Sequence, residues 1–70
     1  MTKKELQKLR KAMPPKYRET LSVQFDITAG YVDQIFRGEK NRIDVITTAI
    51  ELAEAHKEFL AQQKEKIRNL

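Results

Sequence analysis

The chain of 70 residues contains no cysteine, and glycine and proline occur only twice each. Without cysteine the chain forms neither a disulfide nor a thiolate metal site, and this composition is typical of a reducing compartment. No apolar run approaches the roughly 18 residues that a membrane-spanning helix needs. No apolar stretch follows the N-terminal lysines, as it would in a signal peptide. We therefore expect a cytoplasmic protein that does not associate with membranes.

The chain also lacks the residue combinations that catalysis requires. It has a single serine, Ser22, and a single histidine, His56, with no glycine-rich phosphate loop and no carboxylate pair at a useful spacing. One histidine without cysteine cannot complete a zinc site, so His56 is interpreted as a packing residue. We expect no enzyme activity, no cofactor, no metal and no small-molecule site.

The positive charge is concentrated in the first part of the chain. The net charge is +4; residues 1–43 carry ten of the fourteen Lys and Arg but five of the ten Asp and Glu, while residues 44–70 are slightly negative. A basic surface attracts a polyanion and releases its condensed counterions. Lysines that only increase solubility would give the same balance, so charge alone leaves both interpretations open.

Caps, breakers and apolar periodicity predict an all-α fold with four helices and no strands. Thr2 and Glu5 have the spacing of a capping box at the first helix, and Pro14 and Pro15 end it. Asn41 or Asp44 is the predicted cap of the last helix. The four predicted helices cover about residues 3–12, 16–25, 29–37 and 44–70.

Residues 21–38 have the pattern of a helix, a tight turn and a second helix. Thr28 suits the N-cap of the second helix, and Gly38 suits its C-terminal end. A short helix held on the surface in this way commonly enters the DNA major groove. The apolar positions have the spacing of two helices that pack at a steep angle: Leu21, Phe25, Val32, Ile35 and Phe36.

This segment resembles the helix-turn-helix of the phage-repressor and Cro-like regulators. The resemblance covers about residues 16–42, and the polar loop 38–42 resembles the basic loop after the recognition helix in that family. It implies a lambda repressor-like helix-turn-helix domain, residues 1–57, in a phage or prokaryotic transcription regulator such as a repressor. The matching positions are Leu21, Phe25, Ile27, Thr28, Val32, Ile35, Phe36 and Gly38.

Three features depart from the family pattern. Ser22 replaces the usual alanine, and its small side chain still permits close packing. Asp26 replaces the usual glycine of the turn, where Asp tolerates a positive φ better than most residues. One long helix follows residue 42, whereas the family often has two short helices. The dimer geometry of the family therefore does not transfer directly.

The resemblance assigns base-contacting positions to the exposed face of the second helix. Gln34 has the strongest reading capacity, because its amide can bond adenine at N6 and N7. Asp33 can accept from cytosine N4 but would repel a phosphate. Glycine at position 30 permits close approach to DNA, or it is simply tolerated in a first helical turn. The predicted base-contacting residues are Thr28, Ala29, Gly30, Asp33 and Gln34.

Phosphate contacts are predicted on both sides of the same helix. One group lies at the start of the preceding helix, where free N–H groups also favour phosphate. The other follows the recognition helix, and Tyr31 adds a hydroxyl. Together they would hold the two strands beside one groove. The set is Lys16, Tyr17, Arg18, Tyr31, Arg37, Lys40, Asn41 and Arg42.

We expect a sequence-specific regulator that binds double-stranded DNA as a homodimer. One recognition helix makes few contacts, and two helices one DNA turn apart, about 34 Å, supply more. Residues 58–70 extend past the predicted core and offer a seam for dimerisation. An interaction adaptor of a phage or mobile element, working through the long last helix, and an RNA-binding module remain alternatives. The predicted seam consists of Phe59, Leu60, Gln63 and Ile67.

Overall fold

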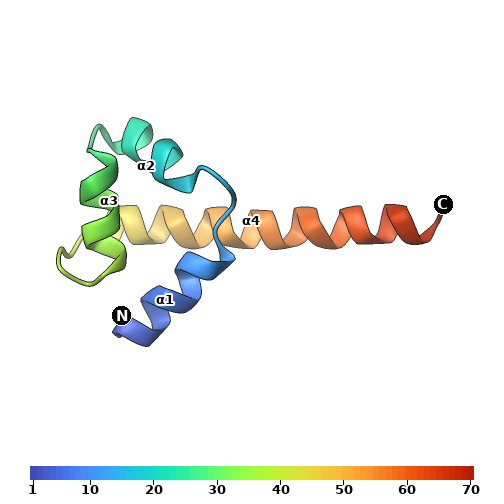
Figure 1. Cartoon of the computed structure of the whole chain (residues 1–70), viewed down its shortest axis with the longest axis horizontal. Helices are drawn as coiled ribbons and strands as arrows, with labels where there is room; N and C mark the ends of the chain where they lie inside the picture. Colours follow the sequence, from blue (N-terminus) through green and yellow to red (C-terminus); the bar gives the residue numbers. More distant parts are fainter.

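The computed structural model describes residues 1–70 and contains helices and turns only (Figure 1). The all-α class and the number of helices are confirmed. Each bound lies within two residues of its prediction, the usual scatter of helix ends. The helices are α1 (Lys3–Ala12), α2 (Tyr17–Phe25), α3 (Ala29–Phe36) and α4 (Ile43–Arg68).

A capping box begins α1, as predicted. The Thr2 N–H donates to Glu5 Oε1 at 3.0 Å, and the Glu5 N–H donates to Thr2 Oγ1 at 3.2 Å. The hydrogen bond that the Thr2 N–H donates to the ionised carboxyl is the main reason why the pKa of Glu5 lies below its ordinary value. The helix ends at Ala12, and Met13 is extended before the two prolines, as the steric restriction on a residue before proline requires.

Two residues in the left-handed region bracket α2. Lys16 precedes the helix with φ 63°, and Asp26 follows it with φ 53°. The positive φ expected at Asp26 is confirmed. The chain closes this helix end with the N–H of Ile27, which donates to the carbonyl of Ser22 at 2.9 Å. This left-handed cap turns the chain within three residues, so that α3 packs back on α2.

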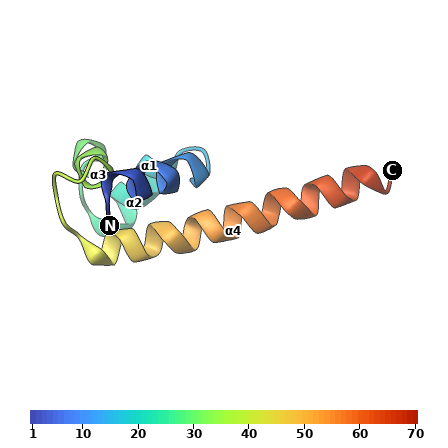
Figure 2. The ribbon, with the colours of Figure 1, turned by 90° about the horizontal axis from the view of Figure 1, so that it is seen from below.

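The core forms where α2 packs on α3 and α4, and where α1 packs on the same two helices (Figures 1 and 2). Leu21, Val32, Ile35 and Val45 are the largest side chains with almost no exposure. No charged or polar residue is buried. The core cluster consists of Leu9, Met13, Leu21, Val32, Ile35, Phe36, Val45, Ala49 and Ala53.

Val45 is fully buried. It lies in the first turn of α4 and belongs to the same core cluster as Leu21, Val32 and Ile35. The predicted cap of α4 was wrong. Arg42 is the N-cap residue of α4 and makes no capping hydrogen bond with its side chain. Its guanidinium is instead paired with Asp44, which lies inside the first turn rather than at the cap.

The second half of α4 extends beyond the other helices (Figure 2). The last buried residue is Ala53, and the longest dimension of the molecule is 45 Å. The helix continues without interruption through the predicted boundary at residues 57 and 58. None of the four helices combines the length and the apolar character that crossing a bilayer demands.

Candidate nucleic-acid interface

Helix α3 lies at the end of the molecule opposite the C-terminus (Figure 1). Its inner face is anchored by Val32, Ile35 and Phe36, which are all buried. Every predicted base-contacting residue lies on the remaining face. Thr28 and Gly30 are exposed, and the other three residues are partly exposed, so this face of α3 is open to a ligand.

The N-terminal end of α3 has the predicted cap. The Tyr31 N–H donates to Thr28 Oγ1 at 3.0 Å, so the hydroxyl of Thr28 is already used within the chain while its methyl group remains for a ligand. Gly30 is not required by packing, because a Cβ at this position would meet nothing closer than Thr28 Oγ1 at 3.9 Å. The missing side chain at Gly30 therefore has no effect on packing within the chain. It would matter only for a molecule that binds this face of α3.

Asp33 and Arg18, predicted to contact a base and a phosphate, pair with each other. Arg18 Nη2 donates to Asp33 Oδ2 at 2.7 Å, and both side chains remain partly exposed. This ion pair ties the start of α2 to the middle of α3. A carboxylate held by a guanidinium is less available to accept from a base, and the guanidinium is partly neutralised toward phosphate.

The other two predicted arginines also have acidic partners nearby. Arg37 pairs with Glu39, two residues further along the chain. Arg42 makes two hydrogen bonds to Asp44, at 2.8 and 3.0 Å, which raise the pKa of Arg42 and lower that of Asp44. The Arg42 guanidinium also lies 6.0 Å from the centre of the Tyr31 ring.

Lys16 and Lys40 are the predicted phosphate-binding cations that take part in no ion pair. Both are exposed, and they lie at opposite ends of the α2–α3 unit in the chain. Asn41, next to Lys40, is likewise exposed in the loop before α4. Gly38 shapes this loop through its φ of 82°, a conformation that side chains disfavour.

Tyr17 contributes to both the interface and the core. Its ring packs edge-on against Phe36, with centroids 5.3 Å apart and an interplanar angle of 69°. It also lines a hollow of about 650 Å³ between α1 and α2, together with Gln7, Arg10, Lys11 and Arg18. The predicted phosphate contacts do not include Arg10 or Lys11. Only the packing of α1 shows that they extend the basic surface.

The predicted dimerisation residues lie outside the core, on α4. Phe59 and Leu60 are about half exposed, Ile67 is 68% exposed, and Gln63 is partly covered. The spacing 53, 56, 60, 63, 67 and 70 alternates three and four residues, which is the repeat of a helix–helix seam. The predicted seam therefore extends from the core side of α4, where Ala53 is buried, into the exposed half.

Comparison with known protein families, with curated proteins and with solved structures gives no match for this chain. The assignment of a function rests on the geometry described above.

Proposed function

We propose that this protein is a lambda repressor-like helix-turn-helix regulator that places α3 in the major groove of double-stranded DNA. The observation that carries the proposal is the division of α3 into two faces. Val32, Ile35 and Phe36 fix its inner face in the core, while Gln34 and the first turn remain open. A short helix with a buried apolar face and an uncovered polar face is what major-groove reading requires.

The charges around α3 support the same proposal. Lys16 and Arg18 belong to the segment before it, and Lys40 and Arg42 belong to the loop after it. Cations on both sides suit the two phosphate strands that border one groove, and Arg10 and Lys11 add charge beside the first group. The acidic partners of Arg18, Arg37 and Arg42 reduce this attraction, so we expect moderate affinity for each copy.

A dimer formed through the exposed half of α4 compensates for the small number of contacts. Helix α3 has eight residues, which reach only a few base pairs. Two copies joined along Leu60, Gln63 and Ile67 would place two α3 helices on one duplex. The exposed apolar side chains of this seam support self-association, because exposed apolar patches commonly mark protein contacts.

Selection of bound duplexes from a random DNA library tests the proposal, followed by salt titration of the selected duplex. We expect Gln34→Ala to relax the preference at one or two base pairs. Lys40→Ala should weaken binding to all sequences and reduce the slope of log K against log salt by about 1. Val23→Ala, on an exposed position of α2, serves as the control. Affinity that does not depend on salt, or no enrichment of any duplex, would contradict the proposal.

The second candidate function is an interaction adaptor that works through α4. It is favoured by the exposure of Phe59, Leu60 and Ile67 beyond the core. Under this proposal the basic half would be incidental. If this chain binds a partner protein but shifts neither DNA nor RNA in a mobility assay, the result would support the adaptor function over the regulator function.

A further inference from the structure

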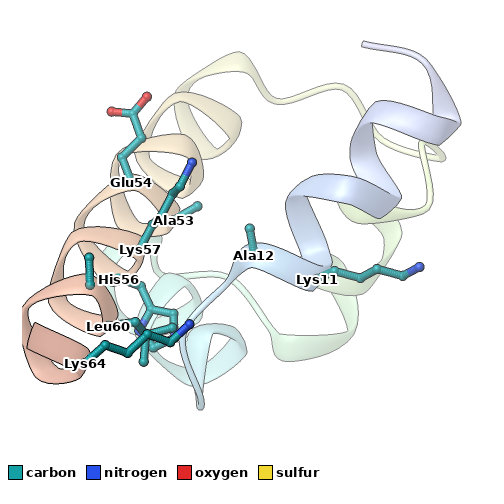
Figure 3. Close-up of a pocket in the computed structure, with 9 residues that line it drawn as sticks. Lys11, Ala12, Ala53, Glu54, His56, Lys57, Leu60 and Lys64 are labelled. Atoms are coloured by element: carbon teal, nitrogen blue, oxygen red, sulfur yellow. The ribbon is translucent and has the colours of Figure 1, made fainter. Parts of the chain in front are cut away.

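A groove separates the C-terminal end of α1 from the middle of α4 (Figure 3). Its volume is about 540 Å³, and its apolar lining consists of Ala12, Ala53, Leu60 and Ala61. Figure 3 shows Ala12 on the α1 side and Leu60 with Lys64 on the α4 side. Three alanines among the lining residues leave space that a larger side chain from another molecule can fill. The groove is separate from the α3 face, and Lys11 is its one residue that also belongs to the basic surface proposed to attract DNA.

The charged residues at this groove are mostly of one sign. Lys11, Lys57 and Lys64 line it, against a single acidic residue, Glu54. His56 lies among them and stacks on Phe59, with ring centroids 6.5 Å apart. None of these lysines takes part in an ion pair within the chain. An apolar groove bordered by unpaired cations favours an occupant with apolar and acidic faces.

A second copy of the chain fits the groove poorly. To enter it, the second tail would lie antiparallel along α4. In the register that pairs Leu60 with Gln63, Lys57 of one copy would then lie beside Lys66 of the other. The tail, residues 58–70, carries Lys64, Lys66 and Arg68 against Glu58 and Glu65, so its net charge does not complement the lysines of the groove. In the parallel arrangement the proposed seam includes Leu60, which also lines the groove, so a second copy and a partner helix would compete for this side chain.

We propose that the groove binds an acidic amphipathic helix of a partner protein. The apolar face of such a helix would pack on Leu60 and fill the space above Ala53 and Ala61, and its carboxylates would lie against Lys57 and Lys64. This is the recognition of a helix by a groove, in which apolar side chains at helical spacing supply the anchors. The proposal does not depend on DNA binding.

The test uses the full chain, labelled with ¹⁵N, and two synthetic 16-residue peptides that share one leucine face. One peptide carries glutamate at all other positions and the second carries lysine. We expect the acidic peptide to shift the amide signals of Ala12, Ala53, Leu60 and Ala61, and to bind at least tenfold more tightly than the basic one.

Charge reversal decides whether the lysines act as proposed. The double variant Lys57→Glu and Lys64→Glu should reverse the preference between the two peptides. The matched control, Lys66→Glu with Arg68→Glu, changes the net charge equally at positions outside the groove and should preserve the preference. Equal binding of both peptides, or shifts confined to α3 or to residues 66–70, would overturn the proposal. Concentration-dependent shifts of Ala12, on the α1 side of the groove and outside the proposed dimer seam, would assign the groove to a second copy when they occur without peptide, and would overturn the proposal as well.

Discussion

Arg18 and Asp33 form an ion pair across the helix-turn-helix, with Arg18 Nη2 2.7 Å from Asp33 Oδ2. The two residues are fifteen positions apart, and both had been predicted to face DNA separately. Because both side chains are partly exposed, the pair adds little to folding, typically less than about 1 kcal/mol for such pairs. Its main consequence is electrostatic, since the Asp33 carboxylate partly neutralises Arg18 beside the proposed reading face.

Removing this carboxylate should strengthen DNA binding. Asp33→Asn frees Arg18 and deletes a charge that repels phosphate, so we expect higher affinity for all duplexes and a slope of log K against log salt that is steeper by about 1. Fluorescence anisotropy at several salt concentrations measures both. Asp44→Asn, which frees Arg42, is the parallel variant at the other flank. Unchanged affinity for Asp33→Asn would show that this face of α3 stays away from the duplex.

Folding should depend strongly on Leu21 and hardly at all on Val23, two residues further along the same helix. Leu21 is fully buried between the helices, whereas Val23 is 82% exposed. We expect Leu21→Ala to lower the free energy of unfolding by about 3 kcal/mol, out of roughly 4–10 kcal/mol for a chain of this size. Val23→Ala should change it by less than about 0.5 kcal/mol. Urea denaturation followed by circular dichroism makes the comparison, and similar losses for both variants would contradict the packing of α2.

The turn before α3 should prefer glycine to alanine at position 26. Asp26 has φ 53°, where a Cβ is disfavoured and Asp is better tolerated than Ala. We expect Asp26→Gly to be more stable than Asp26→Ala by about 1 kcal/mol. Thermal unfolding of the two variants, with Gln24→Ala on the exposed helix surface as reference, measures the difference. Equal stability would mean that the turn does not hold a positive φ in solution.

Local signals in the sequence were sufficient to locate the helices. The capping box of Thr2 with Glu5, the cap at Thr28 and the positive φ at Asp26 each depend on residues within a few positions, so they can be read before the fold is known. The inward direction of Val32 and Ile35 follows from helical spacing in the same way. The fold class and the exposed face of α3 were therefore predictable.

Features that join distant segments were not predictable. The pairing of Arg18 with Asp33 and the position of Arg10 beside Tyr17 depend on how α1, α2 and α3 pack, and no spacing rule encodes that. The groove between α1 and α4 exists only because α1 ends beside Ala53, so composition gave no sign of it.

Lowering the pH should destabilise α1, because it protonates the Glu5 carboxyl. The pKa of its carboxyl is lowered in the folded chain, chiefly by the hydrogen bond from the Thr2 N–H. A group with a lowered folded pKa stabilises the fold above its unfolded pKa, and this contribution is lost as pH falls through the folded value. As the pH is lowered below about 4.5, we expect the melting temperature to fall less steeply in Glu5→Gln than in the parent chain. The glutamine keeps the capping geometry without titrating. Glu65→Gln, on the exposed tail, is the control and should follow the parent chain.

Deleting residues 58–70 should separate assembly from folding. Every buried residue lies at or before Ala53, so the shortened chain keeps its complete core. We expect its melting temperature to fall by only a few degrees, because the lost side chains are mostly exposed. Its affinity for a two-site duplex should fall by at least tenfold, since the seam along Leu60 and Ile67 is removed and each copy must bind alone. Sedimentation of both chains with and without the duplex provides the measurement, and Leu60→Asp with Ile67→Asp in the full chain repeats it without truncation. A shortened chain that remains monomeric yet binds the duplex as tightly as the full chain would show that α4 serves some purpose other than pairing two copies.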